Sequence, residues 1–272
     1  MPFMNTGSFQ TDIIFESRGL AAYVLIFAFV MGSVFGSFVN CMAWRLAHGE
    51  RITGGRSHCT ACGHVLGPLD LVPIFSYLFL HGKCRYCGEK ISPRYMITEL
   101  LLAAVFVGCI LRYGLGFDAL RWMAFSCCLL GLSLVDLETC TIPDRFLVAA
   151  LVIYALTLPV TAAPVPDQLR SGIPGALLLG AGMLVLSLLF DKVTGKESLG
   201  GGDIKLYFVA GLYLGPVGGL LCLILSCVLG LLFSAGIRKR RIPFGPAISA
   251  AILLTAFFGS PLILWYEGLL GF

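Results

Sequence analysis

Long apolar runs separated by short polar segments dominate the hydropathy pattern of this chain. Eight runs have the composition of membrane-spanning helices, although the sixth is short and its boundary falls at Gly215-Pro216. They cover residues 20–44, 96–113, 119–136, 145–163, 172–190, 204–215, 217–236 and 247–266. The pattern therefore predicts an all-α polytopic membrane protein with about eight transmembrane helices.

One segment, residues 45–95, interrupts this pattern. It contains all four histidines, four of the eleven cysteines and seven of the nineteen Lys and Arg residues. We expect a small extramembrane domain between the first and second helices. The predicted division is an N-terminal segment with the first helix (1–44), this domain (45–95) and a seven-helix membrane domain (96–272).

Composition agrees with the membrane class. Apolar residues make up 58% of the chain and charged residues 12%, and the mean hydropathy is +0.91. The net charge of +4 is too small to indicate nucleic-acid binding. Among the 33 glycines, Gly32 and Gly36 have the spacing of small residues at close helix contacts.

The distribution of basic residues predicts the orientation, because cytoplasmic loops of membrane proteins are enriched in Lys and Arg. With the 45–95 domain in the cytoplasm, fifteen of the nineteen Lys and Arg residues fall inside, including the cluster Arg238–Arg241. The loops near 137–144, 191–203 and 237–246 are then cytoplasmic as well. We expect a multi-pass protein of the cytoplasmic membrane.

The first candidate for chemistry is Asp203, which follows Gly200, Gly201 and Gly202 at the cytoplasmic edge of an apolar run. A carboxylate at a membrane edge is costly and indicates function. Glycines leave room for another chain to approach the backbone, so the three are a candidate surface for substrate approach. The alternative is a flexible loop with a helix-capping Asp.

A second carboxylate, Asp136, ends the apolar run Trp122 to Val135 and is the deepest acidic residue on the same side. The topology places Asp136 and Asp203 at one level. Two close carboxylates in a poorly hydrated place share a proton and can activate water against a peptide bond, as in aspartic proteases. A cation-binding transporter or scaffold is the alternative from another class.

The polar domain carries two Cys-x-x-Cys pairs, Cys59 with Cys62 and Cys84 with Cys87, separated by twenty-one residues. Four thiolates from two such turns can form a tetrahedral Zn²⁺ site. A reducing cytoplasm disfavours disulfides. Because all four positions are cysteines, the predicted zinc is structural, and it would stabilise a domain too small to fold by its core alone.

The acidic segments resemble those of the type IV prepilin peptidases, which are membrane aspartic proteases. Gly200–Asp203 is similar to their Gly-x-Gly-Asp signature, and Asp136 resembles their other catalytic aspartate, with Pro143 and Asp144 downstream. Ile242–Pro246 resembles the family's segment before the last helix. The resemblance implies that Asp136 and Asp203 are the catalytic pair.

The N-terminal part resembles the corresponding domain of the longer, bifunctional members. The matching segments are Gly36–Asn40, Arg56–Cys59, Asp70–Pro73, Gly82–Cys84, Ile91–Tyr95 and Glu99. The resemblance implies a bacterial inner-membrane enzyme whose substrates are prepilins of type IV pili or pseudopilins of type II secretion. It would remove their basic leader at the cytoplasmic face.

The same resemblance implies N-methylation of the new N-terminus with S-adenosyl-L-methionine. No glycine-rich cofactor loop is visible, so the residues themselves do not define a methyl-donor site. Asp70 and Glu99, which lie in the segments that carry the resemblance, are candidates for it. Their alternatives are turn capping for Asp70 and a helix-end charge for Glu99. A peptidase that transfers no methyl group is the alternative function.

Overall fold

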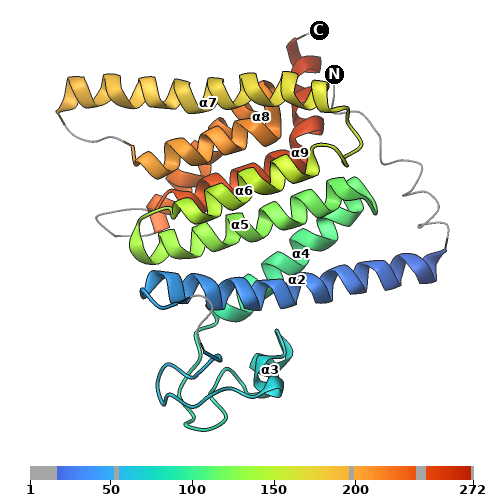
Figure 1. Cartoon of the computed structure of the whole chain (residues 1–272), viewed down its shortest axis with the longest axis vertical. Helices are drawn as coiled ribbons and strands as arrows, with labels where there is room; N and C mark the ends of the chain where they lie inside the picture. The colour runs from blue at the N-terminus through green and yellow to red at the C-terminus, as the bar shows by residue number, and fades with distance from the viewer. Residues whose placement is uncertain (1–16, 52–54, 196–198, 237–242, 271–272) are drawn as a thin grey trace. The chain divides into compact units, whose positions relative to one another are not determined.

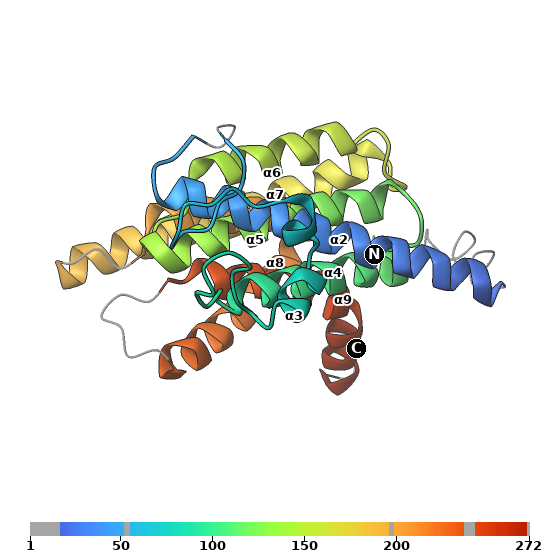
Figure 2. The ribbon, with the colours of Figure 1, turned by 90° about the horizontal axis from the view of Figure 1, so that it is seen from below.

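The computed structural model describes residues 17–51, 55–195, 199–236 and 243–270. Within these ranges the regular structure is helical, apart from two isolated β-bridges. The helices are α2 (Arg18–Ala47), η1 (Pro68–Leu71), α3 (Phe75–Phe79), α4 (Arg94–Tyr113), α5 (Phe117–Thr139), α6 (Asp144–Thr157), α7 (Val165–Thr194), α8 (Gly201–Gly236) and α9 (Gly245–Leu270). Figures 1 and 2 show them from two directions. The all-helical prediction is confirmed.

Six helices in the described part of the chain, α2, α4, α5, α7, α8 and α9, are long and apolar enough to cross a membrane. The short helix α6 has 14 residues, a length of about 21 Å. That is less than the hydrocarbon core of a bilayer, about 30 Å. The multi-spanning class is therefore confirmed, whereas the count of eight spans stays a prediction.

The long segment α8 contains a chain reversal. Gly215 has non-helical angles, φ 70° and ψ −175°, and Pro216 follows it. Tyr207 Oη lies 2.6 Å from Ser226 Oγ, although nineteen residues of continuous helix would separate them by about 28 Å. Residues 201–214 and 216–236 are therefore two antiparallel helices, and the turn lies at the predicted boundary.

The chain divides into two compact units. The N-terminal unit holds α2, η1, α3 and α4, and the C-terminal unit holds α5 to α9, with the division between Leu115 and Gly116. By these contacts α4 belongs with α2. The apolar pattern instead placed the helix at 96–113 within the peptidase domain, residues 96–272. Which residues make up the peptidase domain stays a prediction.

In the N-terminal unit, α2 and α4 pack as an antiparallel pair at a glycine contact. A Cβ on Gly32 would lie 2.6 Å from Ala103 Cα, and a Cβ on Gly36 would lie 2.9 Å from Glu99 Cα. The predicted close contact at Gly32 and Gly36 is thus confirmed. Further along, the buried side chain of Asn40 donates to Thr98 Oγ1.

In the C-terminal unit, α7 and α8 approach each other at backbone distance. A Cβ on Gly175 would lie 2.6 Å from the carbonyl carbon of Gly215, and one on Gly211 would lie 2.7 Å from Ala176 N. The first half of α8 lies between α6 and α7 (Figure 1), and α5 packs against α6 and α9. Small residues thus set the packing of this unit.

Helix α7 begins at Val165, seven residues before the predicted apolar run. The additional turns at the start of α7 contain polar side chains, and one of these supports the loop between α6 and α7. Gln168 Nε2 donates to the carbonyls of Leu158 and Ala163 and to Thr161 Oγ1. The basic cluster Arg238–Arg241, used above to predict orientation, lies outside the described residues.

Candidate functional site

Asp136 lies in the last turn of α5 with only 4% of its surface exposed. The helix ends at Thr139, and the next residue, Cys140, has left-handed angles and donates its N–H to the carbonyl of Asp136 over 2.8 Å. The Asp136 carboxylate itself accepts the N–H of Gly245 at 2.9 Å. Its position is therefore set by two elements, the end of α5 and the start of α9.

Gly245 is a residue whose role the sequence analysis did not find. A Cβ at this position would lie 2.8 Å from Asp136 Oδ2, so only glycine brings its N–H to the carboxylate without displacing it. The preceding Phe244 packs its ring on Gly230. The sequence did contain a signal for the role of Gly245. The pair Gly245-Pro246 stands just before the last apolar run, within the segment that resembles the prepilin peptidases.

Asp203 lies in the first turn of α8 and is half-buried. Its N–H donates to Gly200 O over 3.0 Å. The start of α8 touches the α5–α6 loop, because a Cβ on Gly202 would lie 2.8 Å from Ile142 Cβ. Asp136 lies six residues before Ile142, in the last turn of the helix that leads into this loop. The structure thus brings the two aspartates to the same end of the C-terminal unit.

The three glycines before Asp203 differ in their surroundings. A Cβ on Gly201 would meet nothing within 4 Å, and one on Gly200 would meet only the Asp203 carboxylate. Gly202 is packed against Ile142. Open backbone is therefore present at Gly200 and Gly201, where the predicted substrate approach stays a prediction, while the missing side chain of Gly202 serves packing.

The four predicted zinc ligands come together in the N-terminal unit. The Sγ atoms of Cys59, Cys62, Cys84 and Cys87 all lie within 4.8 Å of one another, and those of Cys59 and Cys87 are 3.9 Å apart. Tetrahedral Zn–S bonds of about 2.3 Å require sulfur atoms about 3.8 Å apart. The cluster fits a zinc ion.

Each Cys-x-x-Cys pair sits in the same kind of turn. The N–H of the first cysteine, Cys59 or Cys84, donates to the carbonyl five residues later. The N–H of the glycine that follows the second cysteine, Gly63 or Gly88, donates back to the carbonyl of the first. Both glycines have left-handed backbone, φ 71° and 73°, which explains why glycine follows each pair.

The four thiols influence one another. The backbone N–H groups of Cys62 and Ala61 lower the pKa of the Cys59 thiol to about 7. The N–H of Glu89 lowers the pKa of Cys87, but burial and hydrogen bonds with the other three thiols outweigh it and raise this pKa to about 12.

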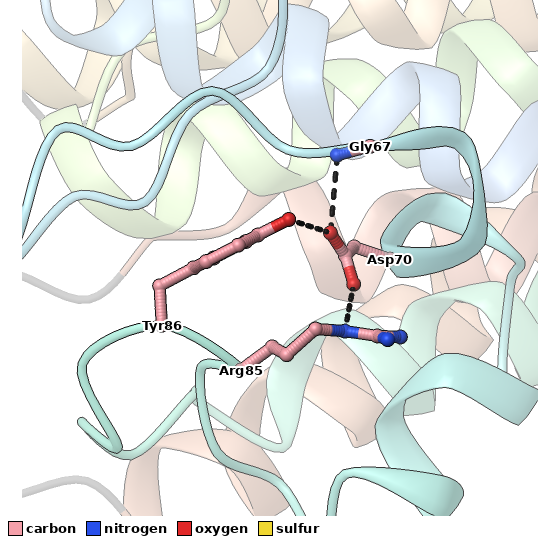
Figure 3. Close-up of polar contacts among 4 residues, drawn as sticks. All are labelled: Gly67, Asp70, Arg85 and Tyr86. Atoms are coloured by element: carbon pink, nitrogen blue, oxygen red, sulfur yellow. Dashed lines mark hydrogen bonds and ion pairs between the residues drawn. The ribbon is translucent and has the colours of Figure 1, made fainter.

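Asp70 connects the turn η1 to the second cysteine turn (Figure 3). Its Oδ2 accepts the Gly67 N–H at 3.0 Å and the Tyr86 hydroxyl at 3.1 Å, and its Oδ1 lies 2.7 Å from Arg85 Nε. Only 6% of its side chain is exposed. Burial alone would raise the pKa of Asp70, but these partners together hold it below its usual value.

Glu99, on α4, is 7% exposed and accepts the N–H of Ile74 at 2.7 Å. Ile74 has φ 63°, which is strained for a β-branched residue, at the residue before α3. The Glu99 carboxylate therefore holds this turn. Because the carboxylates of Asp70 and Glu99 both contact groups of the chain itself, their place in a methyl-donor site stays a prediction.

The fold and the site define the class: a multi-pass helical membrane protein with two aspartates at one end of a helical unit and a four-cysteine cluster in a separate unit. A profile of the bacterial peptidase A24 N-terminal domain matches residues 30–113. A profile of the type IV leader peptidase family matches residues 123–235. No solved structure matches the chain.

Proteins that align with most of this chain give the same result as the two profiles. The prepilin leader peptidase/N-methyltransferase of Bacillus subtilis is 32% identical over 89% of this chain and 98% of the relative, and the protein of that name from Pseudomonas putida is 32% identical over 92% and 96%. The type 4 prepilin-like proteins leader peptide-processing enzyme of Escherichia coli O78:H11 is 33% identical over 90% and 98%. The chain belongs to the type IV leader peptidase family. It is an enzyme, a hydrolase of peptide bonds.

Proposed function

We propose that this protein is an aspartic endopeptidase that removes the leader peptide of type IV prepilins or pseudopilins. The observation that carries the proposal is that Asp136 at the end of α5 and Asp203 at the start of α8 lie at the same end of the C-terminal unit, where Gly202 packs against Ile142 and the backbone of Gly200 and Gly201 is open. The relatives whose printed names refer to prepilins support the substrate class.

In this proposal the two carboxylates divide the proton transfers. Asp136, which accepts the Gly245 N–H, is the base that takes a proton from water. The water oxygen bonds to the scissile carbonyl carbon. Asp203 then gives a proton to the leaving nitrogen as the C–N bond breaks. This is the division of labour in aspartic proteases, where two close carboxylates share one proton.

We place the cleavage at the cytoplasmic face of the bacterial inner membrane. The distribution of basic residues along the chain supports this orientation. A basic leader would then remain in the cytoplasm while the apolar helix that follows it lies in the bilayer. The peptide bond between them would lie at the level of Asp136 and Asp203.

A structural Zn²⁺ bound by Cys59, Cys62, Cys84 and Cys87 is part of the proposal, supported by the sulfur spacing. The ion would join the two cysteine turns. N-methylation of the new N-terminus is proposed from the relatives' names. S-adenosyl-L-methionine would supply the methyl group. Asp70 and Glu99 stay candidates for the methyl-donor site, although both carboxylates already contact groups of the chain itself. The alternative is a peptidase without methyl transfer.

The peptidase proposal is tested by Asp136→Asn and Asp203→Asn in the purified protein, incubated with a prepilin precursor. Each variant is expected to lose leader removal by several orders of magnitude while remaining in the membrane fraction, because neither can complete the pair. Asp118→Asn is the matched control, on the same helix as Asp136 but at its other end. Normal cleavage by either active-site variant would refute the pair.

The methyl-transfer proposal is tested in the same reaction with isotopically labelled S-adenosyl-L-methionine. Mass spectrometry of the cleaved product then separates two outcomes. A product heavier by one labelled methyl group at its N-terminus supports the bifunctional enzyme. A cleaved product without the methyl group supports the peptidase alone, and it leaves the role of the aspartates intact.

A further inference from the structure

An apolar groove of about 570 Å³ runs along the surface of the C-terminal unit between α6 and α7, and α8 forms its floor. Leu147 and Leu151 line it on α6, and Leu177 and Leu184 line it on α7. Phe208 of α8 lies at its base. The groove follows α6 from Asp144 to Leu151, about 10 Å or two helical turns.

We propose that this groove binds the apolar helix of the peptidase's own substrate. The inference rests on the proposed function, because it identifies where that substrate lies while it is cleaved. It commits to a protein helix as the occupant. Membrane lipid is the other candidate and is an outcome of the test below.

The first argument is continuity with the two aspartates. Ile204 and Lys205, which line one end of the groove, directly follow Asp203 on α8. At the same end, α6 begins at Asp144, just after the loop in which Ile142 touches Gly202. A helix lying in the groove therefore has one end beside Asp203, which is where the scissile bond must be.

The second argument is the distribution of charge. Lys205 Nζ lies 2.7 Å from Asp144 Oδ1, and both side chains are largely exposed, at 58% and 64%. The other groove residues are apolar. Asp144 is thus the one carboxylate among the residues that line the groove. Because an exposed ion pair contributes little, Asp144 can exchange Lys205 for a basic side chain of the leader.

The third argument is the size of the residues along α7. Gly180 is required for packing, because a Cβ there would lie 2.8 Å from Phe208 Cβ. The next residue, Ala181, lines the groove, is exposed and has only a methyl group. Small residues let membrane helices approach closely. Leucine side chains therefore form the two sides of the groove, and the small side chain of Ala181 leaves space between them. Side chains of a second helix fit into this space.

The test is photocrosslinking in lipid nanodiscs. A benzophenone amino acid replaces Leu177 or Leu184 in the groove, or the adjacent Leu178 or Val185 outside it, and all four positions are exposed to a similar degree. With a prepilin precursor present, we expect adducts with its apolar helix several-fold more often from the two groove positions. Equal adducts from Leu178 and Val185, or only lipid adducts in the groove, would overturn the inference.

A second measurement does not depend on the crosslinker. Ala181→Trp fills the groove and is expected to raise KM for the precursor about tenfold with little change in kcat, because it removes binding rather than chemistry. Gly182→Trp is the matched control, since a Cβ on Gly182 meets nothing within 4 Å. An unchanged KM for Ala181→Trp contradicts the groove as the binding site.

Wild-type cleavage, measured in parallel, separates this inference from the proposed function. If the wild-type protein removes the leader but the groove positions give no substrate adducts, the groove assignment fails and the peptidase assignment stands. If the wild-type protein does not cleave the precursor, the proposed function fails and the groove assignment fails with it.

Discussion

At the scale of single residues, Asp70 is a candidate for binding the methyl donor, but its observed contacts stabilise the fold around the cysteine turns. Its carboxylate contacts the backbone of η1 and both residues between Cys84 and Cys87. Since the pKa of Asp70 is lowered by folding, these contacts stabilise the fold above the ordinary Asp pKa, about 4. They are lost only as the pH falls through the still lower folded value.

Asp70→Asn is expected to weaken zinc binding roughly tenfold at neutral pH, the lower end of the effect of groups that support metal ligands. Asparagine retains an acceptor for Gly67 N–H but loses the charge beside Arg85. Competition with a chelator of known affinity measures the change. Glu89→Gln, an exposed charge next to the same cysteine turn, is the control. Equal affinities for Asp70→Asn and wild type would show that Asp70 does not support the site.

At the scale of helices, the contact between α7 and α8 depends on glycines that permit backbone contact. Gly175 and Gly211 face each other so closely that either Cβ would overlap the other helix. The same contact places the reversal at Gly215 against α7, since Ser171 Oγ also lies beside Gly215. The position of Asp203 at the start of α8 therefore depends on a contact made further along the same helix.

Gly175→Val is expected to destabilise the protein by about 1–3 kcal/mol, the usual cost of inserting atoms into a packed contact. Gly182→Val, on the same helix but facing open space, is expected to change stability far less. Thermal unfolding in detergent, measured as the loss of soluble protein on heating, compares the two. Equal melting temperatures for these variants would mean that the α7–α8 contact is not tight.

At the scale of the whole molecule, the two units hold different chemistry. The N-terminal unit contains the four-cysteine cluster, whereas Asp136 and Asp203 both lie in the C-terminal unit. The units also reach stability differently. Helix packing supports the C-terminal unit, whereas the proposed zinc would order the two cysteine turns between α2 and α4.

Removal of zinc by a chelator is therefore expected to expose Cys59, Cys62, Cys84 and Cys87 to alkylation, because the metal no longer protects their thiolates. Cys109 and Cys222, both 0% exposed within membrane helices, are internal controls and should stay unmodified. Peptide mass spectrometry before and after chelation identifies the labelled cysteines. If the four are alkylated equally before chelation, no metal is bound there.

Much of this architecture is readable in the sequence because its causes are local. Apolar runs of about twenty residues specify membrane helices whatever packs beside them. The spacing of two Cys-x-x-Cys pairs specifies two turns that can share a metal. A carboxylate at the boundary of an apolar run, such as Asp136 or Asp203, is recognisable as a functional candidate because a charge at the membrane edge is energetically costly.

The tertiary structure decided what depends on contacts between distant segments. Asp136 and Gly245 are 109 residues apart, and no local pattern shows that the N–H of one meets the carboxylate of the other. The reversal at Gly215 is shown by its non-helical backbone angles and by the contact of Tyr207 with Ser226. Sequence periodicity shows which face of a helix is apolar, whereas the partner of that face is chosen by packing, and packing alone revealed the groove beside Asp203.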